Sequence, residues 1–102
     1  MTLSGKQRRF LRAEAHGLEP VVMVGKEGLT DTVVSAVQAA LLAHELIKVR
    51  IHESSPVERQ DVSEQLPGLV KAELAGLVGR VLILYKRHPQ KPRIVLPKEP
   101  KE

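Results

Sequence analysis

The sequence of 102 residues contains no cysteine and no tryptophan, and its aromatic residues are limited to Phe10 and Tyr85. The lack of cysteine excludes disulfides and thiolate metal sites. Two aromatic side chains cannot form the platform on which single-strand binders of the RRM or OB type stack bases. No apolar run approaches 18 residues, so no membrane-spanning helix is expected. No apolar signal segment follows Met1, which predicts a cytoplasmic protein.

Sequence patterns of catalysis are also missing. The four histidines, His16, His44, His52 and His88, do not show the spacing of a metal site. No nucleophile motif, Walker loop or dinucleotide-binding glycine motif is present. We therefore predict no enzymatic activity, no metal, no cofactor and no small-molecule substrate. An enzyme acting on nucleotides is the least supported alternative, because it would need a nucleophile–base pair or a metal cluster.

Positive charge is concentrated at the two ends of the chain. Residues 1–12 hold four basic residues and no acid, and residues 80–102 hold seven basic and two acidic residues. Residues 13–79 hold five basic and ten acidic residues. On a net charge of +4, this segregation indicates a surface for a polyanion. A solvated tail and an ordinary charged helix are the alternative explanation.

Apolar spacing and capping signals predict three helices and four strands. Ser4 and Gln7 fit a capping box at the start of the first helix, and Gly17 ends it. The apolar run at 20–24 predicts a buried strand, and the alternation at 46–52 predicts a strand with one basic face. The expected elements are helix 4–16, strand 20–24, helix 30–43, strand 46–52, helix 55–66, strand 73–78 and strand 81–85.

The last third of the chain contains the less regular predictions. The third helix is expected to begin with Ser55 as its cap and to end near Leu66, because Pro67-Gly68 breaks a helix. Residues 93–96 are expected to be extended and to pair weakly at a sheet edge. The predicted fold class is α/β, in the order α-β-α-β-α-β-β, with a mixed four-stranded sheet packed with helices. One domain is expected at 1–97, followed by a charged tail at 98–102.

The loop Gly25-Lys26-Glu27-Gly28 lies between an expected strand and the clearest expected helix. Two glycines let the backbone approach a ligand closely, and the following helix presents unpaired N–H groups that suit phosphate. KH domains clamp a nucleic-acid backbone with a GXXG loop in this way. Glycines also flank many strand–helix turns for geometric reasons alone, and Glu27 argues against a phosphate at that position.

Four blocks of sequence, in this order, resemble the YhbY family, the single-domain bacterial form of the CRM (chloroplast RNA splicing and ribosome maturation) domain. The blocks are LSGKQR at 3–8, PVVMVGKEGLT at 20–30, HELIKVRI at 44–51 and GRVLILYKR at 79–87. The resemblance spans roughly 3–97 and is weakest at 67–78. It implies a fold like the C-terminal domain of bacterial translation initiation factor three, and RNA binding with the glycine loop near the RNA. For stand-alone bacterial members it implies a part in maturing precursors of the large ribosomal subunit.

We therefore predict a monomeric protein that holds the backbone of structured RNA, with precursor large-subunit rRNA as its target. The candidate contact residues are Lys6, Arg8, Arg9 and Arg12, the loop Gly25, Lys26, Glu27 and Gly28, the strand residues Lys48 and Arg50, and Arg80, Lys86 and Arg87 at the hairpin. For each single cation, a solvated charge is the alternative. Gly28→Asp is expected to weaken RNA binding and to leave thermal stability largely intact. The alternative function is a protein-interaction module that docks on a ribosomal protein, although the sequence shows no large exposed apolar stripe.

Overall fold

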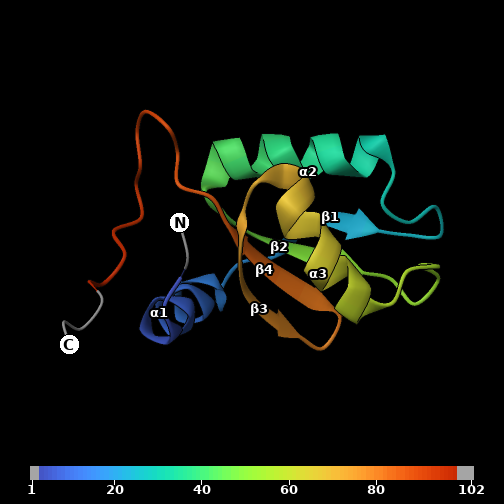
Figure 1. Cartoon of the computed structure of the whole chain (residues 1–102), viewed down its shortest axis with the longest axis horizontal. Coiled ribbons are helices and arrows are strands. Elements are labelled where there is room, and N and C mark those ends of the chain that lie inside the picture. The colour runs from blue at the N-terminus through green and yellow to red at the C-terminus, as the bar shows by residue number, and fades with distance from the viewer. Residues whose placement is uncertain (1–2, 99–102) are drawn as a thin grey trace.

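The computed structural model describes residues 3–98 and has the predicted element order. The elements are α1 (Gly5–Ala15), β1 (Pro20–Val24), α2 (Asp31–His44), β2 (Leu46–Ile51), α3 (Arg59–Val70), β3 (Glu73–Val78) and β4 (Val81–Tyr85). The strands form one sheet in the order β1-β2-β4-β3, with β1 and β2 parallel and the other two pairs antiparallel. The α/β class and the mixed four-stranded sheet are confirmed (Figure 1).

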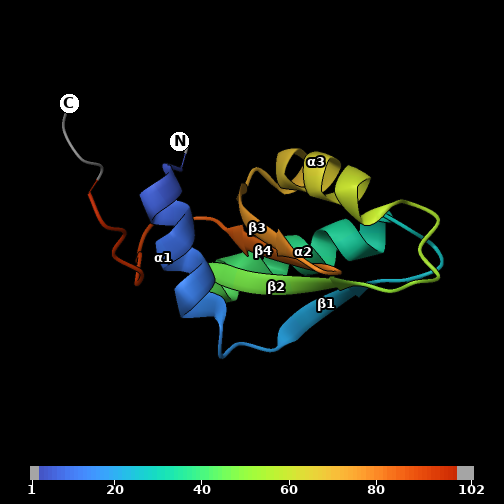
Figure 2. The same cartoon turned by 90° about the horizontal axis from the view of Figure 1, so that it is seen from below.

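The alternating side chains of β2 divide the core into two parts on opposite faces of the sheet. Ile47, Val49 and Ile51 pack with α2 and α3 on one face. Leu46 packs on the other face with Leu11 of α1 and with residues of β3 and β4. Eleven residues make α1 only about 16 Å long at 1.5 Å per residue. Because α1 packs mainly on β3, it leaves the β1 side of its face uncovered (Figure 2).

The helix starts follow the predicted capping signals for α1 and α2. Ser4 Oγ accepts the Gln7 amide at 3.1 Å, and the Gln7 side chain accepts the Ser4 amide at 3.0 Å. Thr30 Oγ1 accepts the Val33 amide at 3.1 Å. These bonds satisfy amides that a helix start would otherwise leave without partners.

The prediction of a buried strand at 20–24 was wrong for two side chains. Val21 and Met23 are 51% and 54% exposed, whereas Val24 is fully buried. The cause is the position of β1 at the edge of the sheet, where α2 covers one face and nothing in the described residues covers the other. The continuous apolar run therefore alternates between a core face and an open face.

The third helix begins and ends later than predicted. Ser55 Oγ accepts the Val57 amide at 3.2 Å, so it caps a local turn, and α3 begins at Arg59 after Glu58, which makes no capping side-chain bond. The helix continues through Pro67 to Val70, because Val62, Leu66 and Val70 recur every four residues and are all buried on one face. Lys71 then ends the helix in the left-handed conformation.

The expected edge pairing at 93–96 was also wrong, because a buried carboxylate holds this segment. Glu45 is 0% exposed. Its carboxylate accepts the backbone amides of His88 at 2.9 Å, Arg93 at 2.6 Å and Ile94 at 3.0 Å. Burial alone would raise the pKa of Glu45, but these three amides and the nearby Arg93 charge outweigh it, so the pKa is lowered.

The segment after β4 packs across the start of α1. Ile94 and Leu96 contact the α1 side of the core, and Gln7 Nε2 donates to the Pro97 carbonyl at 3.1 Å. Of the charged tail expected at 98–102, all but Lys98 lies outside the described residues. Within residues 3–98, no helix is long and apolar enough to span a membrane.

Candidate nucleic-acid interface

The open face of the sheet carries Lys48 and Arg50 among exposed apolar side chains. Side chains two residues apart on a strand point to the same face, so both cations project away from α2 and α3. The strand register pairs Arg50 with Met23 of β1 on one side and with Val81 of β4 on the other. The result is a row of two cations bordered by aliphatic groups. Such a surface can bind phosphates and contact sugars or bases through its apolar part.

Beside these cations, the face is hollowed into a groove of about 610 Å³ between the end of α1 and the sheet. We call it the basic groove. Its lining residues are Arg12, His16, Leu18, Glu19, Pro20, Lys48, Arg50, Val78, Val81 and Ile83. Three Lys or Arg side chains face one carboxylate there, so the groove has a net positive charge. The structure thus brings together the predicted residues Arg12, Lys48 and Arg50 from α1 and β2.

Arg12 is held in the groove by β3. Its Nη1 donates to the Ala75 carbonyl at 2.9 Å. A Cβ atom on Gly76 would lie 2.7 Å from Arg12 Cδ, so the side chain crosses the strand where β3 has no side chain of its own. A guanidinium restrained in this way loses less conformational freedom when it binds an anion.

His16 is a groove residue that sequence reasoning assigned no binding role. It follows the last turn of α1, and its carbonyl accepts Lys48 Nζ at 3.4 Å. This contact joins the end of the helix to the basic face of β2. The sequence offered no signal for it, because residues 16 and 48 meet only through the tertiary fold.

The Gly25–Gly28 loop lies at the same end of the sheet as Arg50. The His52 amide donates to the Val24 carbonyl at 2.9 Å, and the Ile51 amide donates to the Arg80 carbonyl at 2.7 Å. These bonds place the glycine loop, the 52–57 loop and the β3–β4 turn at the same end of the sheet. Lys26 and Arg80 therefore lie at the same end of the sheet as Arg50.

The two glycines of this loop differ in role. Gly28 has a positive φ of 74° and is buried, and an added Cβ would lie 3.4 Å from Pro56 Cγ. The expectation that Gly28→Asp would leave stability intact therefore has no support in the structure, because this backbone conformation disfavours a side chain. Gly25 has no atom within 4 Å of an added Cβ. Glu27 and Asp31 place two acids near the start of α2, so the loop is less cationic than the basic groove.

The remaining predicted contacts are dispersed. Lys86 and Arg87 follow β4 at the opposite end of the sheet, where Tyr85 pairs with Leu46, so they are not part of the basic groove. Lys6, Arg8 and Arg9 are exposed on the first half of α1, whose first turn contains no acid. Arg8 Nη1 donates to the Leu3 carbonyl at 2.7 Å. Within residues 3–98, no three His, Asp or Glu side chains gather to hold a metal.

Comparison with known proteins identifies the family of this chain. The profile of the CRS1/YhbY (CRM) domain matches residues 3–86. The chain belongs to the CRM-domain family. This CRM domain is 39% identical over 95 residues to "Probable RNA-binding protein YqeI" of Bacillus subtilis, covering 93% of this chain and 99% of the relative. It is 39% identical over 98 residues to a protein of Haemophilus influenzae named "RNA-binding protein", covering 96% and 98% of the two chains.

The solved structures include a relative with the same fold. The solution structure of SAV1595 from Staphylococcus aureus superposes on the CRM domain with a TM-score of 0.80 and 29% sequence identity. The match covers 94% of this chain and 100% of the other. The α/β fold with a mixed four-stranded sheet is therefore shared with SAV1595, and the two relatives named above are RNA-binding proteins by their names.

Proposed function

We propose that this protein binds structured RNA through the basic groove, without catalysis, as an assembly factor for the large ribosomal subunit. The observation that carries the proposal is the convergence of Arg12, Lys48 and Arg50 on an open sheet face in a member of an RNA-binding family. The RNA backbone would cross the face near these cations and reach the Gly25–Gly28 loop at the sheet end. Lys26 and Arg80 would add further phosphate contacts.

The chemistry of the groove favours backbone contacts over base reading. Its cations are Arg and Lys, which bind phosphate through charge-assisted hydrogen bonds. The two aromatic residues do not lie in it, since Tyr85 is buried and Phe10 packs on the α1 core. A protein without stacking side chains in its groove should prefer the fixed phosphate spacing of folded RNA to a flexible strand. Precursor rRNA of the large subunit, in the cytoplasm, is the proposed target.

The proposed domain extends beyond the residues matched by the family profile, to Pro97. Ile94 and Leu96 complete the core under α1, and the Pro97 carbonyl accepts the Gln7 side chain. We propose that the protein works as a monomer, with one groove for one RNA segment. Removing residues 87–97 should therefore destabilise α1 and the basic groove with it.

The decisive experiment compares two double variants with equal loss of charge. Lys48→Ala with Arg50→Ala removes groove cations, and Lys71→Ala with Lys91→Ala removes two exposed cations outside the groove. Each phosphate contact contributes a factor of about 5–8 at 0.1 M salt relative to 1 M, from a slope of about −0.7 to −0.9 per contact. The groove pair should thus lose about 30-fold in affinity for a folded rRNA fragment, and the magnitude of its salt slope should fall by about 1.5.

The control pair should lose less than about threefold, because general charge attraction falls off within a Debye length of about 10 Å. Equal losses for both pairs would refute a localised groove and leave a generic basic protein. An unstructured strand of equal length tests the preference for folded RNA. Equal affinity for both RNAs would contradict recognition of shape.

A further inference from the structure

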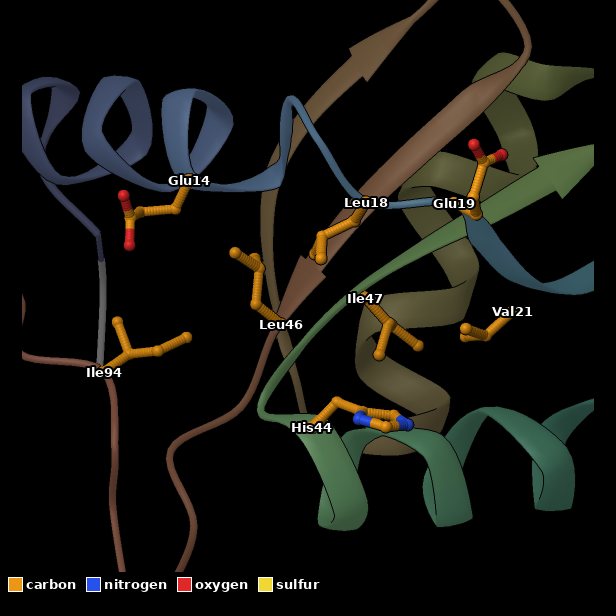
Figure 3. Close-up of a pocket in the computed structure, with 8 residues that line it drawn as sticks. All are labelled: Glu14, Leu18, Glu19, Val21, His44, Leu46, Ile47 and Ile94. Atoms are coloured by element: carbon orange, nitrogen blue, oxygen red, sulfur yellow. The ribbon is translucent and has the colours of Figure 1, made fainter.

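A second groove lies beside the first and has the opposite charge. It has a volume of about 420 Å³ and lies between the carboxyl ends of α1 and α2, next to β1. We call it the acidic groove. Its lining residues are Glu14, Leu18, Glu19, Val21, His44, Leu46, Ile47 and Ile94. Figure 3 shows Leu18, Leu46 and Ile47 in its middle, with Glu14 and Ile94 on one side and Glu19 and Val21 on the other.

The floor of the acidic groove is apolar and its rim is polar. Leu46 and Ile47 are 4% and 1% exposed and form the floor, while the more exposed Leu18 and Val21 add apolar surface that a partner can contact. Glu14 and Glu19 are exposed carboxylates on the rim, and no Lys or Arg lines the groove. An apolar floor within a polar rim is the usual anatomy of a protein contact.

The negative charge of this groove comes from side chains. The carbonyl ends of both helices would add negative partial charge, but each already has a cationic partner. Lys48 Nζ contacts the His16 carbonyl after α1, and the Arg93 guanidinium donates to the Ala43 carbonyl at the end of α2. The two rim carboxylates therefore decide which partner the groove accepts. They repel a phosphate backbone, so RNA does not fit here.

We propose that the acidic groove binds an extended segment of a basic protein, in which an apolar anchor side chain is flanked by Lys or Arg. The anchor would lie on Leu46 and Ile47, and the flanking cations would pair with Glu14 and Glu19. β1 pairs with β2 only from Lys48 onward, so within the described residues the edge of β2 at Leu46 and Ile47 has no strand partner on the β1 side and can accept such a segment as an added strand. This site shares Leu18 and Glu19 with the basic groove but contains none of its cations, so its occupation by a peptide can be measured without RNA.

The test uses a defined peptide and the full chain. The probe is the acetylated, amidated peptide Lys-Val-Leu-Val-Arg, and the charge-inverted peptide Glu-Val-Leu-Val-Glu is its control. Backbone amide shifts are followed by NMR during each titration at low salt. The basic peptide should shift the amides of Leu18, Val21, Leu46 and Ile47, and the inverted peptide should bind at least about fivefold more weakly because of charge repulsion.

Charge reversal on the protein gives the matching comparison. Glu14→Lys with Glu19→Lys should weaken the basic peptide by about fivefold to tenfold, the combined effect of two exposed ion pairs turned repulsive. Glu64→Lys, an exposed acid on α3 outside the groove, should change it by less than about twofold. Melting curves of these variants should match that of the parent, because the substituted side chains are exposed.

Four outcomes would overturn the proposal. The first three are the absence of any saturable shift at the groove, equal binding by the charge-reversed protein, and shifts confined to the basic groove. The fourth is that the chemical shifts of the groove amides depend on protein concentration without peptide. If this dependence disappears in Val21→Lys, the occupant is a second copy of the chain and the proposal is wrong. In a parallel titration, the affinity of the charge-reversed protein for RNA should be unchanged or increased. Loss of peptide binding can therefore be distinguished from loss of RNA binding.

Discussion

Removal of the Glu45 carboxylate should detach the C-terminal segment from the end of α2. In Glu45→Gln, one oxygen can still accept Arg93 and Ile94, but the amide group meets the His88 N–H donor to donor. Hydrogen bonds to a charged acceptor contribute about 1.5–3 kcal/mol each, so this variant should lose about 2–3 kcal/mol. Glu45→Ala loses all three bonds, but release of the segment should limit the cost to about 4 kcal/mol.

Thermal unfolding and amide hydrogen exchange measure this effect. A domain of this size should melt about 4–8 °C lower for each kcal/mol lost. In Glu45→Gln, the amides of His88, Arg93 and Ile94 should lose protection before those of the β-sheet. Glu53→Gln, at an exposed glutamate, is the matched control and should melt like the parent protein. Unchanged melting and unchanged protection at all three amides would refute the anchoring role of Glu45.

The same interaction predicts a pH dependence with a definite sign. The pKa of Glu45 is lowered in the folded protein from its ordinary value of 4.5. A lowered folded-state pKa stabilises the protein above the unfolded-state value, and this stabilisation is lost as pH falls through the folded-state value. The melting difference between the parent and Glu45→Gln should therefore be constant at neutral pH and shrink below about pH 4.5. A difference that grows on acidification would contradict this reasoning.

Three further predictions concern single positions. Gly76→Ala should displace Arg12 from β3 and weaken RNA binding about fivefold, as much as Arg12→Ala should. Equal affinities of Gly76→Ala and the parent in an RNA titration would contradict a role for Gly76 in positioning Arg12. Gly28→Ala should lower the free energy of unfolding by about 1–2 kcal/mol in chemical denaturation because of its positive φ. Gly25→Asp should keep the parent's stability and weaken RNA binding, and unchanged RNA affinity of Gly25→Asp would contradict a contact between the loop and the RNA. Tyr85 is the one tyrosine, and burial together with the Glu45 charge raises its pKa above the ordinary value of 10.0, so ultraviolet titration of the folded protein should show less than half tyrosinate at pH 10. The stabilisation linked to this raised pKa is present below pH 10 and is lost as pH rises through the folded-state value, so half ionisation at or below pH 10 in the native protein would refute it.

Local patterns were sufficient to predict most of the fold. The capping box of Ser4 and Gln7 and the alternation along β2 depend on residues close in sequence, and both were confirmed. The end of α3 was missed because a local rule for proline was given more weight than the four-residue spacing of Leu66 and Val70, which was visible in the sequence. Packing of an apolar face stabilised the last turn despite the missing amide of Pro67.

The candidate site was less predictable, because it depends on contacts between distant residues. Alternation placed Lys48 and Arg50 on one face, but it could not place Arg12 beside them. That position requires α1 to pack on β3 with Gly76 beneath the side chain. Glu45 was similarly hidden, since its partners are amides more than forty residues further along the chain. Identical side chains in a different fold would make neither contact.

The end of α1 links the fold to both proposed surfaces. The helix stops at Ala15, and the following Gly17 turn carries the chain to β1 at the far edge of the sheet. A helix two turns longer would extend about 11 Å further and cover Lys48 and Arg50. It would also remove the turn that carries Leu18 and Glu19, which border both grooves. The short helix costs apolar burial at Val21 and Met23, and this uncovered surface is what a partner molecule can bury.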